Sequence, residues 1–134
     1  MARMIFPNLP VKDIAASVAF YEALGFTKNA QFSDENTASM VVDEHIVIML
    51  LHESRWKDFT TKAIPDAHAT CEVMLAFSTE SKDEVDALYT KGLAAGGAEG
   101  NPPQDHGFMY GKSVEDPDGH ILEFFWMDPA TVQG

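Results

Sequence analysis

The sequence shows one order of secondary-structure signals twice. Residues 4–11 form an apolar, strand-like run, and a helix is predicted to begin after Asp13, whose carboxylate can accept hydrogen bonds from the first helical turn. Gly25 then provides the residue type that commonly ends a helix in a left-handed conformation. Three more strands are predicted after it, at residues 26–32, 38–42 and 46–51. The first part of the chain therefore predicts a strand, a helix and three strands.

The same order returns after a segment without clear periodicity. Residues 71–78 are strand-like, and Ser81 with Glu84 three residues later has the spacing of a capping box at the start of a helix. Gly96 and Gly97 then end that helix. Three strands are predicted after it, a short one within residues 98–104 and two longer ones at 108–114 and 120–127, with a turn at 116–119. The two parts make a repeat of about 50–55 residues.

The repeat predicts an α+β fold built from two βαβββ modules. We predict a single domain over residues 1–134, with module one at about 1–52, a linker at 53–68, module two at about 69–127 and a tail at 128–134. One helix covers only one face of a four-stranded sheet, so two modules must pair, either within the chain or across a dimer. The paired modules are expected to form a curved mixed sheet with a concave cup, and concave surfaces are where small molecules bind.

Charge and cysteine content exclude several classes of protein. The chain has 21 acidic and 9 basic residues, which gives a net charge of −12. Nucleic acids and anionic membrane surfaces attract clustered lysine and arginine, so neither is expected as a partner. The apolar runs are shorter than a signal peptide core of roughly 7–15 residues or a membrane span of ~18–20 residues. Cys71 is the only cysteine, which excludes an internal disulfide; we expect it to be buried in its apolar run, in a cytoplasmic protein.

Four stretches of the sequence carry a family resemblance. They are residues 9–13 at the entry of the first helix, residues 20–26 at its end, residues 102–111, and residues 116–124. The last stretch is the most specific, because Glu123 follows its Asp-Pro-Asp-Gly turn by four residues. Together they resemble the vicinal-oxygen-chelate superfamily, which includes glyoxalase I, extradiol dioxygenases and bleomycin-resistance proteins. Residues 102–111 look like the branch called predicted lactoylglutathione lyases.

The resemblance implies a divalent metal ion in the cup. Such an ion is held by one residue from the first and one from the fourth strand of each module, and it acts as a Lewis acid on two neighbouring substrate oxygens. Carried onto this sequence, the positions fall on Phe6 or Asn8, Met49, Glu72 and Glu123. Only Glu123 keeps the residue of the family, and Glu72 is an oxygen ligand in place of histidine. If a metal is bound, the resemblance therefore assigns Glu123 and Glu72 as its ligands, and the identity of any cofactor stays open.

Glu123 and Glu72 are also the candidate catalytic residues. Alternation along the last strand places Glu123 on one sheet face with Ile121 and Phe125, in a run that is otherwise apolar. Each glutamate could simply meet solvent on an open sheet face or pair with a cation. If both lie in one apolar cup, a carboxylate there can act as a general base or hold the amine or hydroxyl of a ligand.

Other residues are predicted to line the cup. Two strands contribute from module one, and the loop at 104–110 is expected to cross the mouth of the cup and offer hydrogen bonds. The ligand-binding candidates are Phe6, Asn8, Met49, Gln104, His106 and Tyr110. His106, like the other histidines, is alternatively a turn or surface residue, because no pair of histidines has a compact zinc-binding spacing.

Two functions follow from the resemblance. The first is a glyoxalase-like protein that binds a small molecule in the cup, with lyase or isomerase activity of the lactoylglutathione lyase type and a degenerate metal site. The second is a non-catalytic binding or sequestering protein of the bleomycin-resistance type. An extradiol dioxygenase would need two histidines and one carboxylate, and the aligned positions supply no histidine. A small-molecule ligand and a second copy of the chain, in a homodimer, are the expected partners.

Overall fold

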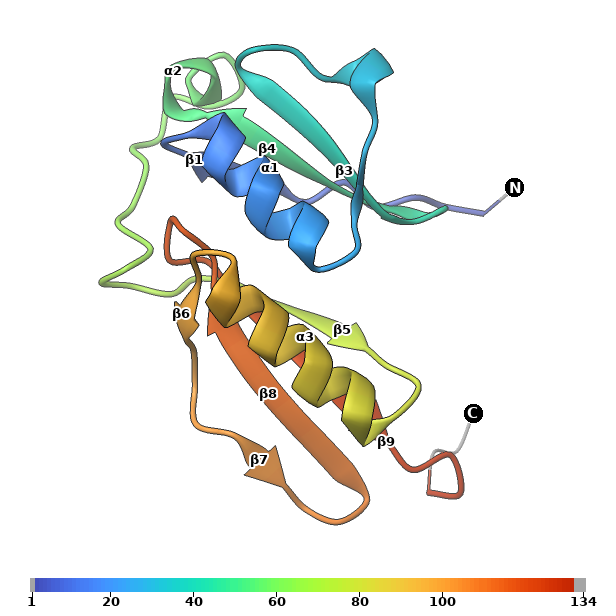
Figure 1. Cartoon of the computed structure of the whole chain (residues 1–134). Coiled ribbons are helices and arrows are strands. Elements are labelled where there is room, and N and C mark those ends of the chain that lie inside the picture. Colours follow the sequence, from blue (N-terminus) through green and yellow to red (C-terminus); the bar gives the residue numbers. More distant parts are fainter. Residues whose placement is uncertain (1, 132–134) are drawn as a thin grey trace.

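The structure, a computed structural model, describes residues 2–131 and shows module one as a sheet with a helix against one face (Figure 1). The elements of this module are β1 (Asn8–Val11), α1 (Ile14–Ala23), β2 (Thr27–Lys28), the 3-10 helix η1 (Ala30–Phe32), β3 (Thr37–Asp43) and β4 (Ile46–His52). The strands are hydrogen-bonded in the order β1-β4-β3-β2. Because β1 runs parallel to β4 and the other pairs are antiparallel, the sheet is mixed.

Module two repeats this plan after a linker that contains the short helix α2 (Glu53–Trp56). Its elements are β5 (Met74–Ser78), α3 (Lys82–Ala94), β6 (Ala98–Glu99), β7 (Gln104–Asp105), β8 (Met109–Glu115) and β9 (Ile121–Met127). The sheet order is β5-β9-β8-β6, with β7 also paired to β8, and β5 runs parallel to β9. The predicted α+β fold with repeated modules is confirmed. None of the helices in residues 2–131 is long and apolar enough to cross a membrane.

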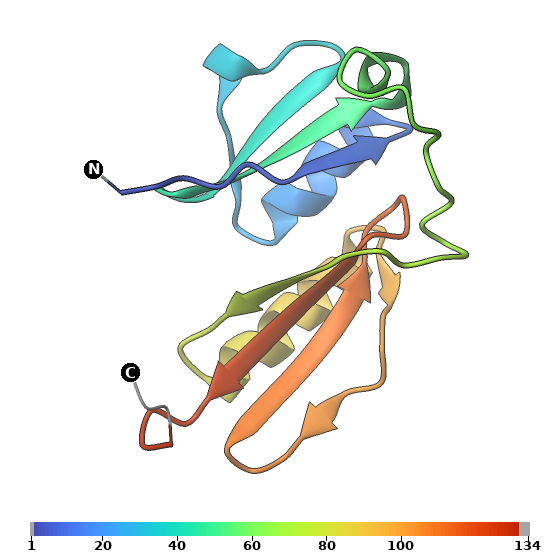
Figure 2. The same cartoon turned by 180° about the vertical axis from the view of Figure 1, so that it is seen from behind.

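The two modules pack against each other within the chain. Helices α1 and α3 lie on the same side of the molecule, and the uncovered sheet faces, called here the open faces, lie on the other side (Figures 1 and 2). One apolar core joins both modules; its buried members are Leu9, Val11, Phe20, Tyr21, Leu24, Ala38, Met40, Ile48, Leu50, Val85, Val114, Leu122 and Phe124. The rings of Phe26 and Phe77 also meet across the boundary, with centroids 5.5 Å apart.

Several predicted strands are shorter than the apolar runs suggested. The strand expected at 26–32 is limited to β2, because the Asn29 side chain accepts a hydrogen bond from the backbone N–H of Gln31 and starts η1. The strand expected at 4–11 begins at Asn8, with only an isolated bridge at Ile5 before it. The strand expected at 71–78 begins at Met74.

The prediction that Cys71 is buried is wrong, because its residue is exposed. It precedes β5 in a segment that lacks strand pairing, so the apolar run around it does not enter the core. The predicted tail at 128–134 lies partly outside the described residues, which end at 131.

The turn between β8 and β9 ties the two modules together. Asp116 is only 2% exposed, and it accepts hydrogen bonds from the Tyr21 hydroxyl at 2.6 Å and from the backbone N–H groups of Asp118 and His120 at 2.9 Å each. Asp118 in turn accepts from the backbone N–H of Lys12 at 2.9 Å. The His120 ring Nε2 lies 2.8 Å from the carbonyl oxygen of Pro10. These contacts connect the turn of module two to β1 and α1 of module one.

Burial sets the electrostatics of this connection. Burial raises the pKa of Asp116, although the neighbouring His120 and the hydrogen bond from Tyr21 both act to lower it. Burial also raises the pKa of Tyr21 well above its ordinary value, and the negative charge of Asp116 adds to the shift. The Tyr21 hydroxyl therefore keeps its proton and donates it in a hydrogen bond to the Asp116 carboxylate, which has little access to water.

We predict that Tyr21→Phe destabilises the fold by about 1.5–3 kcal/mol, because it removes a hydrogen bond to a buried charged group. Tyr89→Phe is the matched control, since the Tyr89 hydroxyl donates to Glu99 at 2.5 Å at an exposed site where water can replace it. The measurement is the free energy of unfolding in urea for both variants. Equal losses in the two variants would contradict the assigned role of Tyr21.

Candidate functional site

The open face of module one holds an apolar groove of about 540 Å³. Strand alternation creates it: Leu9, Ile48 and Leu50 turn into the core, so their neighbours turn to the open face. Asn8, Met49 and Ser39 lie side by side there on β1, β4 and β3. The complete lining is Met4, Phe6, Asn8, Asn29, Phe32, Ser39, Val41, Val47 and Met49.

The polar groups of this groove are neutral and partly satisfied within the protein. The side-chain amide of Asn8 donates to the carbonyl oxygen of Phe6 at 2.7 Å, and the side-chain oxygen of Asn29 accepts from Gln31. Ser39 is buried. Among the described residues that line the groove, none carries an ionisable side chain.

The open face of module two has a different character. Glu123 lies in the middle of β9, paired with Ala76 on β5 and with Ser113 on β8, and its side chain is half-buried. Its strand neighbours Leu122 and Phe124 turn into the core, which places Glu123 on the open face as the alternation predicted.

Glu72 and Glu123 are not brought together. Glu72 precedes the first residue of β5 and is exposed, and it lines a second pocket, between the modules, with Asn8 and Trp56. The partner of Glu123 on β5 is Ala76 instead. The expectation of two carboxylates in one apolar cup is therefore wrong.

A spacing in the sequence indicates the register that the strands adopt. Asn8 lies five residues before Asp13, the N-cap of α1, and Ala76 lies five residues before Ser81, the N-cap of α3. Since the two modules repeat one plan, Ala76 is the counterpart of Asn8. The first-strand position assigned to Glu72 thus belongs four residues further along the chain.

The loop at 104–110 does not place its candidates in the groove. The Tyr110 hydroxyl donates to Asp86 of α3 at 2.6 Å, so this side chain lies on the helix side of the sheet and not on the open face. Lys112 Nζ lies 2.8 Å from the same carboxylate. Gln104 pairs with Gly111 in the β7–β8 ladder, and the exposed His106 ring lies beside Phe108. Of the six ligand-binding candidates, the groove contains Phe6, Asn8 and Met49.

Comparison with known proteins identifies the family of this fold. A model of the glyoxalase/bleomycin resistance protein/dioxygenase superfamily matches residues 3–124. The chain belongs to this superfamily. No curated protein matches the chain.

Solved structures with the same fold include a hypothetical protein from S. aureus, which is 27% identical over 94% of each chain with a TM-score of 0.79. A glyoxalase-related enzyme from Fulvimarina pelagi is 23% identical over 94% of this chain and 88% of its own, with a TM-score of 0.78. A glyoxalase/bleomycin resistance protein/dioxygenase family enzyme from Burkholderia phytofirmans PsJN is 19% identical over 94% of this chain and 99% of its own, with a TM-score of 0.76.

The metal-binding positions implied by the superfamily do not fit a divalent ion here. With the register given by the structure, these positions hold Asn8, Met49, Ala76 and Glu123. They supply one carboxylate, an amide, a thioether and a methyl group, whereas such ions need several imidazole, thiolate or carboxylate ligands. Within residues 2–131, no cluster of three histidine, cysteine or acidic residues is arranged to hold a metal.

We predict that the protein purified without chelators contains only substoichiometric nickel, zinc, iron or manganese. An ion that binds only the folded state raises the melting temperature. Because Asn8, Met49, Ala76 and Glu123 offer too few ligands to bind these ions, we expect the melting temperature to stay unchanged when they are added. Elemental analysis and thermal unfolding with and without each ion are the measurements. One metal ion per chain that disappears in Glu123→Gln would contradict this expectation.

Proposed function

We propose that this protein binds a small organic molecule in the groove of module one, as a binding protein of the bleomycin-resistance type. The observation that carries the proposal is the groove itself. Its volume of about 540 Å³ lies within the range of roughly 300–1,000 Å³ that is typical of ligand sites. Apolar side chains with a few neutral polar groups favour a ligand portion that is uncharged and largely apolar.

Exposed aromatic side chains at the groove support this proposal. Phe6 is 48% exposed and Phe32 is 62% exposed, although both line a groove that could bury them against a ligand. Large exposed apolar groups that gather around a hollow mark interaction sites more often than single scattered ones do. A ligand seated in the groove would remove this apolar surface from water.

We predict that Phe32→Ala weakens the binding of a neutral apolar dye such as Nile red by about tenfold, since burying a phenylalanine contributes about 1.5–3 kcal/mol. Phe59→Ala is the matched control, because Phe59 is also 62% exposed but lies outside the groove against Arg55. The affinity is measured by dye fluorescence. Equal losses in both variants, or no saturable binding to the unmodified chain, would overturn the proposed site.

A second candidate function is a lyase of the lactoylglutathione lyase type. Glu123 favours it, because this half-buried carboxylate lies on the open face between Ala76 and Ser113 and could serve as a general base. A glutathione conjugate is anionic, however, and the groove offers it no cationic side chain among the described residues. Turnover of a hemithioacetal of glutathione that is lost in Glu123→Gln would favour the lyase over the binding protein.

We also propose that the chain forms a homodimer in the cytoplasm. The segment before β1 supports a dimer, because Met4, Ile5 and Phe6 are 43%, 60% and 48% exposed. A second copy that covers this segment would also close one side of the groove. Light scattering on the purified protein tests the proposal, and a monomer at all accessible concentrations would contradict it.

A further inference from the structure

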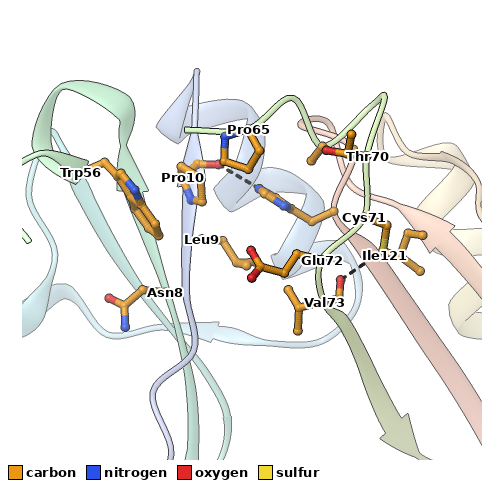
Figure 3. Close-up of a pocket in the computed structure, with 13 residues that line it drawn as sticks. Asn8, Leu9, Pro10, Trp56, Pro65, Thr70, Cys71, Glu72, Val73 and Ile121 are labelled. Carbon is orange, nitrogen blue, oxygen red and sulfur yellow. Dashed lines mark hydrogen bonds between the residues drawn. The ribbon is translucent and has the colours of Figure 1, made fainter. Parts of the chain in front are cut away.

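A second hollow, of about 390 Å³, lies between the modules. We call it the inter-module pocket. β1 and α2 form one wall, and the segment that precedes β5, together with the start of β9, forms the other (Figure 3). Its lining residues are Asn8, Leu9, Pro10, Trp56, Pro65, Ala67, Thr70, Cys71, Glu72, Val73, Gly119, His120 and Ile121.

An aromatic ring and a carboxylate enter this pocket from opposite walls. Figure 3 shows Trp56 of α2 on one side and Glu72 on the other, with the Glu72 carboxylate turned toward the side of Trp56. The ion pairs found in residues 2–131 involve His45, His68 and Lys112, and none of them involves Glu72. The Glu72 charge is thus free to meet a ligand.

The charged side chains in and next to the inter-module pocket favour a positively charged ligand. None of the described residues that line the inter-module pocket is a lysine or an arginine. The His120 ring is engaged at Nε2 with the carbonyl oxygen of Pro10. An adjoining hollow shares Pro10, Pro65, Ala67 and His120 with the pocket. It adds the carboxylates of Glu53, Asp66 and Asp118 and the basic side chains of Lys12 and His68. The net charge of −12 attracts cations over a longer range as well.

We propose that the inter-module pocket binds an organic cation, such as an alkylated ammonium group. The face of the Trp56 indole attracts a cation through the ring quadrupole, and Glu72 supplies the opposite charge. A compact ammonium group with apolar substituents matches both partners, because its substituents contact the apolar wall of Leu9, Val73 and Ile121 while its charge faces the carboxylate.

The position of Asn8 extends this proposal to the class of ligand. Asn8 lines both the inter-module pocket and the groove of module one, so the two hollows adjoin at this residue. One ligand with an apolar body in the groove and a cationic end in the pocket would occupy both. This extension to an amphipathic organic cation rests on the proposed function, whereas cation binding by the pocket does not.

The test compares two probes of nearly the same shape that differ in charge. Choline carries the ammonium group, and 3,3-dimethylbutan-1-ol has a neutral carbon in its place. In NMR titrations of the intact chain, choline is expected to shift the backbone amides of Thr70, Val73 and Ile121 saturably, and to bind roughly three- to tenfold tighter than the alcohol. Equal affinity for the two probes would overturn the proposal.

Matched variants assign the two contacts. Glu72→Gln is expected to weaken choline binding by about threefold, while Glu80→Gln, which removes the same charge from the exposed loop after β5, leaves it unchanged in about 0.15 M salt. Trp56→Leu should weaken binding by about threefold to tenfold, and Trp56→Phe should restore most of it. Equal effects of the two glutamate variants, or no effect at Trp56, would contradict the assignment.

These readouts separate the two proposals. If choline binds the pocket but Nile red does not bind the groove, the cation site stands and the proposed function fails. If Nile red binds the groove and choline does not shift the pocket amides, the proposed function stands and the cation site is overturned. A dodecyltrimethylammonium probe that binds no tighter than choline would overturn the amphipathic ligand alone.

Discussion

The buried contact between Asp116 and Tyr21 is the constraint on which the arrangement of the modules depends. Neither sheet can cover both of its faces with one helix, so each module needs the other to complete the core. The Tyr21 hydroxyl of α1 satisfies a carboxylate in the β8–β9 turn, at a donor–acceptor distance of 2.6 Å. The His120 ring after that turn also contacts the carbonyl oxygen of Pro10 on β1. This contact fixes β1, which lines the groove, relative to module two.

The two modules share a plan but present different chemistry on their open faces. Asn8 and Ala76 occupy equivalent positions, as do Met49 and Glu123, yet module one gives a neutral apolar groove and module two a single half-buried carboxylate. A metal-dependent reaction of the kind found in this superfamily needs donors from both modules at these positions. The sequence supplies one carboxylate, Glu123, and this favours ligand binding over metal-dependent catalysis.

The fold could be predicted from the sequence because its signals are local: capping residues, terminal glycines and alternating strands recur in the same order. Phe6, Asn8 and Met49 were assigned through the family resemblance; they line the groove, and their role in ligand binding stays a prediction. The error at Glu72 arose because the register was taken from the apolar run at 71–78 and not from the N-cap Ser81, which lies five residues after Ala76. The error at Tyr110 came from its hydrogen bond to Asp86 of α3. Asn29, Phe32, Ser39, Val41 and Val47 were missed as lining residues; alternation with the buried Ala38 and Met40 indicates two of them, Ser39 and Val41.

We propose that the groove of module one, and not the open face around Glu123, is the ligand site. Backbone amide shifts on titration with a neutral aromatic alcohol such as 1-naphthol test it most directly. We expect saturable shifts at Ser39, Val47 and Met49, which lie on β3 and β4. Shifts confined to Ser113 and Glu123 on module two would contradict it.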